Sequence, residues 1–139
     1  MGTLTYSPLA GGLLSGQWRK DAAPTPTSAA RPSARFDMST AANQRKLDIV
    51  DALALVAEEA GVTLIELAIA FVINHPGVTS AIIGPRTTEQ LESQLSAANV
   101  TLSTEVLDRI DELATPGVTI NPDDNSYGAV ELATGKRRR

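Results

Sequence analysis

The sequence contains no cysteine, a single histidine and no long uninterrupted run of apolar residues. The absence of cysteine excludes disulfides, thiolate metal sites and a cysteine nucleophile. It also fits a reducing compartment, so we expect a cytoplasmic protein. No segment approaches the roughly 18 consecutive apolar residues of a membrane span, and no basic segment followed by an apolar one marks a secretory leader. We therefore expect no membrane association.

Positive charge is scarce outside the C-terminus. The chain has 12 Lys and Arg against 16 Asp and Glu, a net charge of −4. Four of the basic residues form the terminal run 136–139, which leaves the rest of the chain with a net charge of −8. An acidic body argues against nucleic-acid binding. We interpret the basic run as a solvated tail, because blocks of like charge are usually disordered.

The first half of the chain predicts a strand, a loop and a helix. The β-favouring stretch 4–7 predicts a short strand, which Pro8 and the following glycines end. Residues 20–40 are rich in Pro, Ser, Ala and Thr, which predicts a long exposed loop. Apolar residues spaced three and four apart predict an amphipathic helix over 41–60, with Gly61 at its C-terminal cap.

A second helix and a second strand follow. Thr63 and Glu66 have the spacing of a capping box, and the apolar run after them predicts a helix buried almost all round. Pro76 and Gly77 end it. The continuous apolar run 78–84 predicts a parallel strand buried on both faces.

Two further helices complete the predicted order. Thr87 and Gln90 have the spacing of a second capping box at the start of the first. The second is predicted over 104–114, and residues 116–139 are predicted as a C-terminal tail. The inner face of the helix over 104–114 is predicted to carry Val106, Leu107, Ile110 and Leu113.

Strands that alternate with helices indicate a parallel α/β fold. Two parallel strands alone would leave both outer edges unpaired, and so small a sheet is marginal in water. The sequence therefore predicts one part of a larger structure.

Both predicted strands end in turns that suit a bound anion. The first, "YSPLAGG", offers Ser7 and the backbone amides near Gly11 and Gly12. The second, "GPRTTEQ", places Arg86 at the start of a helix, where free amides and the helix dipole favour a phosphate. The planar guanidinium of an arginine also matches phosphate oxygens. Either turn alone is a weak signal, because most glycine turns bind nothing.

Taken together, "YSPLAGGLLSG" and the later "IIGPRTTEQL" closely resemble the last two strand-to-helix units of the aldo-keto reductases. The stretch between them resembles that family too, so residues 1–115 are interpreted as the C-terminal part of an NADP-dependent oxidoreductase. The resemblance implies a (β/α)₈ TIM barrel, of which this chain would hold two of eight parallel strands without closing it. It also implies reduction of carbonyls with NADPH, bound at the C-terminal face of the strands.

The resemblance assigns the first turn to the nicotinamide and pyrophosphate. Tyr6 matches the aromatic residue that stacks against the nicotinamide ring, and Pro8 shapes the turn. Three residues match positions that contact the pyrophosphate largely through backbone groups: Ser7, Leu9 and Gly11. Gln17 stands where many relatives carry a lysine near the pyrophosphate. Arg31 and Arg35 are both left open as replacements for that charge.

The second turn is assigned to the adenosine half of the cofactor. Gly84 and Arg86 match the site of the 2′-phosphate, and this arginine would favour NADPH over NADH. Gln90 matches a residue beside the adenosine. Gln94 falls where the family commonly has asparagine against the adenine edge, which is a departure from the family pattern.

The family's catalytic Asp, Tyr, Lys and His come from earlier strands, and the tyrosine acts as general acid toward the carbonyl oxygen. Neither Tyr6 nor Tyr127 stands at the catalytic position, and His75 is interpreted as a residue at a helix end. We therefore expect a segment that is inactive alone, whose partner would be the missing N-terminal half of the barrel. The alternative is a stand-alone, non-catalytic module that binds a nucleotide or another protein.

Overall fold

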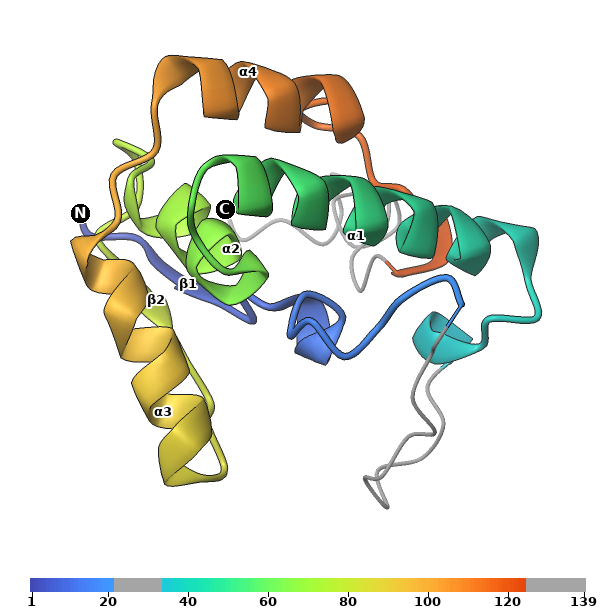
Figure 1. The fold of residues 1–139 in the computed structure, drawn as a ribbon, viewed down its shortest axis with the longest axis horizontal. Helices are drawn as coiled ribbons and strands as arrows, with labels where there is room; N and C mark the ends of the chain where they lie inside the picture. Colours follow the sequence, from blue (N-terminus) through green and yellow to red (C-terminus); the bar gives the residue numbers. More distant parts are fainter. Residues whose placement is uncertain (22–33, 125–139) are drawn as a thin grey trace, which may run out of the picture.

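The computed structural model describes residues 1–21 and 34–124 (Figure 1). Strands and helices follow one another in nearly the predicted order. The strands and α-helices are β1 (Leu4–Tyr6), α1 (Ala41–Glu59), α2 (Leu64–Ile73), β2 (Ser80–Ile82), α3 (Thr88–Leu95) and α4 (Thr104–Leu113). Short 3₁₀ turns lie at Ala10–Gly12, Ala34–Phe36, Ser96–Asn99 and Pro122–Asp124.

The two strands pair in parallel, as the sequence predicts, and form a two-stranded sheet. Leu4 lies opposite Ser80, and Tyr6 lies opposite Ile82. Within residues 1–21 and 34–124 there is no further strand, so the described sheet does not close into a barrel.

The prediction that the second strand is buried on both faces is wrong for this chain. Ala81 is half-buried, but its neighbours Ser80 and Ile82 are exposed. The physical reason is that α2 packs against one face of β2 (Figure 1), while no described element covers the other. On that open face Leu4, Tyr6 and Ile82 are 64%, 76% and 55% exposed.

Helix α1 has the predicted amphipathic pattern, and its apolar side forms the centre of the core. Thr40 caps its N-terminus by accepting a hydrogen bond from the backbone N–H of Asn43. Gly61 follows its end with a φ of +71°, a left-handed conformation that glycine adopts without strain. Four buried apolar side chains of α1 belong to the core cluster: Leu47, Val50, Val56 and Ala57.

Helix α2 begins with the predicted capping box. The Thr63 hydroxyl accepts from the Glu66 backbone N–H at 3.1 Å, and the Glu66 carboxylate accepts from the Thr63 backbone N–H at 2.8 Å. Phe71, in the last turn, is 39% exposed, so the helix is buried over most but not all of its circumference. The buried residues are Leu64, Leu67, Ala68, Ile69 and Ala70.

This capping box makes the stability of the chain depend on pH. The Thr63 backbone N–H, followed by the Ser96 and Thr63 hydroxyls, holds the pKa of Glu66 below its ordinary value of 4.5. A carboxylate with a lowered folded pKa stabilises the fold above its unfolded pKa, and this contribution is lost as the pH falls through the folded value. We expect Glu66→Ala to lower the free energy of unfolding by about 0.3–1.5 kcal/mol at neutral pH, and this difference to shrink below pH 4.5.

Urea unfolding of the wild type and of Glu66→Ala at a series of pH values measures this difference. Glu66→Gln is the matched control, since glutamine keeps an acceptor for the Thr63 N–H but does not titrate. The difference in free energy of unfolding between Glu66→Gln and Glu66→Ala is expected to stay constant across the same pH range. A wild-type advantage that stays constant in acid would contradict the role of the Glu66 carboxylate.

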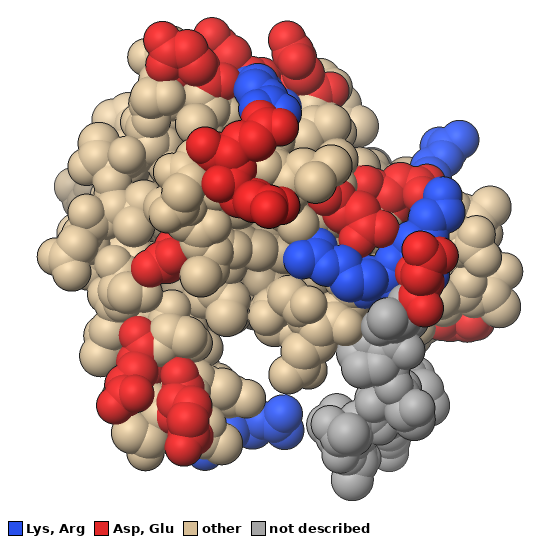
Figure 2. Space-filling view, in the orientation of Figure 1, with Lys and Arg blue, Asp and Glu red and all other residues tan. Residues whose placement is uncertain are grey.

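Helix α4 packs along α1 with the predicted inner face. Ile110 is 6% exposed, and Val106, Leu107 and Leu113 pack beside it against the core. The outer face of α4 is acidic, and Figure 2 shows a concentration of Asp and Glu over this helix and the nearby part of α1. Among the described residues, no helix is long and apolar enough to cross a membrane.

The chain after α4 turns back toward α1. Residues 121–124 belong to the predicted tail, yet Asn121 is only 6% exposed. Its side-chain N–H donates to the Asn43 side-chain oxygen at 2.9 Å. Residues 116–124 therefore do not all extend into solvent, whereas Tyr127 and the basic run 136–139 lie outside the described residues.

Candidate functional site

The parallel pairing of β1 and β2 brings the two predicted anion-binding turns to one edge of the sheet. Because Tyr6 lies opposite Ile82, the turn 7–12 and the loop 83–87 both leave the sheet at the carboxyl ends of their strands. Ligands of parallel α/β proteins bind outside the carboxyl ends of the strands. The geometry therefore unites two motifs that are far apart in the sequence.

The first turn has an unusual concentration of left-handed backbone. Ser7 and Ala10 have φ values of +57° and +50°, and Gly11 and Gly12 follow with +69° and +104°. Backbone hydrogen bonds from Ala10 to Ser7 and from Gly12 to Leu9, both 2.9 Å, hold this conformation. A left-handed conformation costs a non-glycine residue roughly 1–2 kcal/mol, and strain of this kind clusters at ligand sites.

The sequence-predicted residues of this turn differ in how far they reach solvent. Tyr6, Ser7 and Gly11 are exposed, whereas Pro8 and Leu9 are half-buried. Tyr6 shares the open face of the sheet with Leu4 and Ile82, because residues two apart on a strand face the same way. The ring is therefore accessible to a ligand at the carboxyl ends of the strands.

The second turn holds a cation at the start of α3. Arg86 is exposed, and its side chain forms no ion pair within the part of the chain that the structure describes. Its backbone N–H donates to the Gln90 side-chain oxygen at 2.8 Å. The Thr87 hydroxyl caps the helix by accepting from the Gln90 backbone N–H. The free guanidinium beside a helix N-terminus suits a phosphate group.

The predicted second capping box is only half correct. The Thr87 side chain caps the helix, but the Gln90 side chain accepts from Arg86 rather than from Thr87. Gln90 thereby fixes the backbone of the loop that carries the arginine. Gln94, on the same helix, is 8% exposed, so a contact with an adenine would require its side chain to turn outward.

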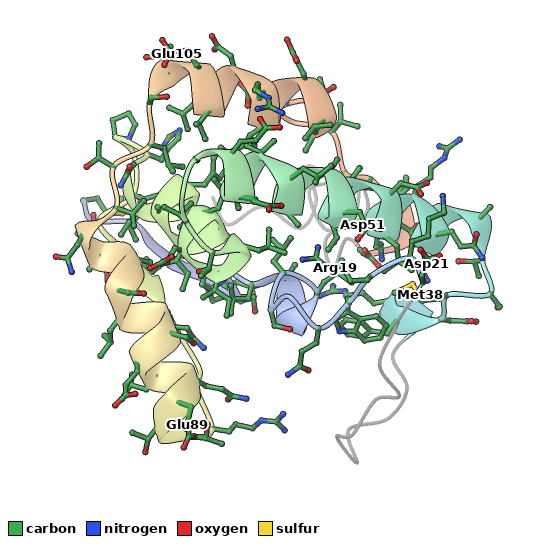
Figure 3. The ribbon with its side chains drawn as sticks, viewed as in Figure 1. Arg19, Asp21, Met38, Asp51, Glu89 and Glu105 are labelled. Atoms are coloured by element: carbon green, nitrogen blue, oxygen red, sulfur yellow. The ribbon has the colours of Figure 1, made fainter. Side chains whose placement is uncertain are left out.

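Glu89 is a residue near this site that the motif analysis missed. It lies in the first turn of α3 (Figure 3). A hydrogen bond from its own backbone N–H, and then one from the Thr87 hydroxyl, lower the pKa of its carboxyl group. Its negative charge beside the helix N-terminus partly offsets the attraction for a phosphate. A glutamate in the first turn of a predicted helix was the available signal.

Two aromatic side chains stack beside the first turn, one of them close to Gly11, and nothing local in the sequence signals their pairing. Trp18 stacks on Phe36 with ring centroids 5.4 Å apart. A Cβ atom at Gly11 would lie 3.2 Å from Cζ of Phe36. The end of the long loop therefore returns to the glycine turn, and both the positive φ of Gly11 and this close approach favour glycine there.

Of the two arginines predicted as possible replacements for a pyrophosphate-binding lysine, the structure describes only Arg35. The Arg35 guanidinium donates to the backbone oxygen of Asp124 at 2.9 Å, and Nε of Arg35 lies 3.7 Å from the Asp124 carboxylate. It is therefore engaged at the C-terminal segment. Arg31 lies outside the described residues, and Gln17 is exposed.

The described residues contain little that could perform acid–base or metal chemistry at this edge. His75 follows α2, and its Nδ1 accepts from the Gly77 backbone N–H at 3.0 Å, which agrees with its interpretation as a residue at a helix end. Within residues 1–21 and 34–124, no group of three His, Cys, Asp or Glu could hold a metal ion.

Comparison with known proteins gives a family match over most of the chain. The model described as "Aldo/keto reductase family" matches residues 1–115. The match includes every strand and α-helix of the described residues and both turns.

Three similar proteins illustrate the range of relatives. A "Probable voltage-gated potassium channel subunit beta" of Arabidopsis thaliana is 34% identical over 122 residues, covering 81% of this chain and 35% of the relative. The "Uncharacterized oxidoreductase YrpG" of Bacillus subtilis is 33% identical over 113 residues, with 81% and 32% covered. The "L-glyceraldehyde 3-phosphate reductase" of Escherichia coli O157:H7 is 30% identical over 118 residues, with 81% and 33% covered. The chain thus spans about a third of the length of these relatives.

Proposed function

Because this chain belongs to the aldo/keto reductase family, we propose that it supplies the NADP(H)-binding end of a barrel that reduces carbonyl groups to alcohols. The observation that carries the proposal is the register of Tyr6 opposite Ile82. This register brings a strained glycine turn to the carboxyl edge of one parallel sheet, together with an arginine that forms no ion pair with any described residue. The relatives that support the chemistry are an oxidoreductase and a reductase by name.

In this proposal the first turn binds the nicotinamide and pyrophosphate, and the second turn with the start of α3 binds the adenosine half of the cofactor. Tyr6 would stack on the nicotinamide, and Arg86 and Gly84 would hold the adenosine 2′-phosphate. Gln90 would lie beside the adenosine, as would Gln94 once its side chain turned outward. Ser7, Pro8, Leu9 and Gly11 form the turn along the pyrophosphate. The exposed ring of Tyr6 and the exposed guanidinium of Arg86 fit these roles. When bound, NADPH supplies the hydride, and this chain's residues orient it.

The acid–base groups of the reaction are proposed to lie on other strands of the barrel. The single histidine of the chain caps a turn beyond α2, and Tyr6 lies in the predicted cofactor site. A general acid must reach the carbonyl oxygen at hydrogen-bond distance. We infer that the chain alone does not reduce carbonyls.

The open face of the sheet supports a barrel partner. Leu4, Tyr6 and Ile82 point to the face that α2 does not cover, and all three are more than half exposed. Interior positions of a (β/α)₈ barrel are filled by such side chains in layers. The remaining strands of the barrel are therefore the proposed partner, and the cytoplasm is the proposed location because the chain has no cysteine.

Titration of the 139-residue chain with NADPH tests the proposal. We expect saturable quenching of the nicotinamide fluorescence and no consumption of NADPH when a simple aldehyde is added. A chain that is folded by circular dichroism but shows no saturation would contradict the cofactor site. Reduction of the aldehyde by the purified chain would contradict the location of the acid–base groups.

The exposed sheet face also supports a second candidate, a stand-alone module that binds a nucleotide or a protein without catalysis. A discrete melting transition of the isolated chain, without the other barrel strands, would favour this module. Aggregation of the isolated chain without binding would favour a segment that depends on the rest of the barrel.

A further inference from the structure

Two polar side chains in the first two turns of α1 are almost completely buried. Asn43 is 1% exposed and Lys46 is 4% exposed. Burial of an amide or a charge is costly unless hydrogen-bonding partners replace the water. Both side chains have such partners, and these come from two segments that are distant in the sequence.

Asn43 connects the end of the long loop with the C-terminal segment. Its side-chain N–H₂ donates to the backbone oxygens of Ala34 and Asp37 at 2.7 and 2.8 Å. Its side-chain oxygen accepts from Asn121 at 2.9 Å. One buried amide thus holds the turn 34–37 and residue 121 against α1.

Lys46 makes the same connection with a charge. Its Nζ donates to the backbone oxygen of Arg35 at 3.0 Å and lies 2.5 Å from the Asp124 carboxylate. Asp124 in turn accepts from Arg35 through its backbone oxygen at 2.9 Å. The Lys46 side chain is 4% exposed and that of Asp124 is 21% exposed, so loss of the carboxylate would leave a largely buried ammonium group without its charged partner.

The turn held in this way carries the aromatic side chain that faces the glycine turn. Phe36 lies between Arg35 and Asp37, stacks on Trp18, and closely approaches Gly11. A continuous series of contacts therefore runs from Asp124 through the turn 34–37 to Gly11. In Figure 1 the segment after α4 passes behind α1 and ends near this turn.

We propose that residues 121–124 act as a C-terminal clasp that positions the proposed pyrophosphate turn. The clasp fixes the turn 34–37 on α1 through Asn43 and Lys46, and this holds Phe36 against Gly11. Asn43, Lys46 and Asp124 are thus positioning residues, distant from the cofactor they affect. The effect on nucleotide binding rests on the proposed function, whereas the effect on Phe36 and Trp18 does not.

Trp18 provides a direct readout, because it is the only tryptophan in the chain and is 8% exposed. Quenching of its fluorescence by acrylamide reports whether the stack with Phe36 is intact. We expect Asp124→Asn and Asn121→Ala to raise this quenching and to weaken NADPH binding about tenfold, within the range usual for coupled sites. Circular dichroism establishes that each variant keeps its helices.

The matched control removes an exposed ion pair on the same helix. Asp48 pairs with Lys20 at 2.7 Å, and the two side chains are 51% and 62% exposed. Asp48→Asn, which makes the same chemical change as Asp124→Asn, is expected to leave Trp18 quenching and NADPH affinity unchanged. Combining Lys46→Met with Asp124→Asn should restore part of the loss, since it removes the unpaired buried charge.

The outcomes separate the clasp from the proposed function. Unchanged Trp18 quenching in folded Asp124→Asn and Asn121→Ala would overturn the clasp, whatever the nucleotide does. Increased quenching with wild-type NADPH affinity would overturn its positioning role. A wild-type chain that is folded by circular dichroism but does not bind NADPH would contradict the proposed function, and the quenching comparison would then decide the clasp alone. If Asp124→Asn loses its helices, Asn121→Ala decides the same question with no charge removed.

Discussion

Replacing Arg86 with alanine is expected to weaken NADPH binding by about 10- to 100-fold and to leave NADH binding nearly unchanged. Hydrogen bonds to charged groups contribute about 1.5–3 kcal/mol, which corresponds to this range of affinity. The guanidinium is exposed and pairs with no carboxylate in the described segments, so it is available for a phosphate. Only NADPH carries the 2′-phosphate that the arginine is proposed to bind.

Calorimetric titration of both nucleotides into the wild type and the variant measures the difference. Arg45→Ala is the matched control, because it removes the same charge from an exposed position on α1. It is expected to change NADPH and NADH affinity equally and slightly, through net charge alone. An equal loss of affinity for NADPH and NADH in Arg86→Ala would contradict the proposal that Arg86 binds the 2′-phosphate.

Replacing Leu67 with alanine is expected to lower the free energy of unfolding by about 2–5 kcal/mol. Leu67 is 2% exposed, lies on α2 and belongs to the core cluster shared with α1. Truncation removes buried surface and leaves a cavity that the packed helices only partly fill. Since small domains are stable by about 5–15 kcal/mol, this single change removes a large fraction of the total.

Urea unfolding followed by circular dichroism measures the loss. Leu55→Ala is the control, because Leu55 on α1 is 59% exposed and its truncation is expected to cost about 0.5 kcal/mol or less. Similar losses in the two variants would mean that the packing between α1 and α2 does not dominate stability. Binding of NADPH should be retained by Leu55→Ala.

The helices were predictable because their signals are local. Thr63 and Glu66 are three residues apart and form the reciprocal hydrogen bonds of a capping box. Gly61 has the positive φ that its place after the helix requires. The two turns were recognisable for a similar reason, since each motif lies within about ten residues of sequence.

Features that depend on distant partners were not predictable. Nothing in the sequence around Lys46 distinguishes it from the exposed Arg45, because the carboxylate that pairs with it is Asp124. The contact between Asn43 and Asn121 spans 78 residues. The exposure of β2 was missed for a related reason: a continuous apolar run indicates what a strand can bury, not which neighbours the chain supplies.

The long separation between Asn43 and Asn121 has a consequence for biosynthesis. The chain leaves the ribosome from its N-terminus, and closing a long loop to join distant residues costs entropy. The first turns of α1 therefore emerge while Asn43 and Lys46, which are buried in the folded chain, still lack their C-terminal partners. Those partners are synthesised only when residues 121–124 follow. A nascent chain halted before them would lack the contacts that, in the proposed clasp, hold Phe36 against the glycine turn.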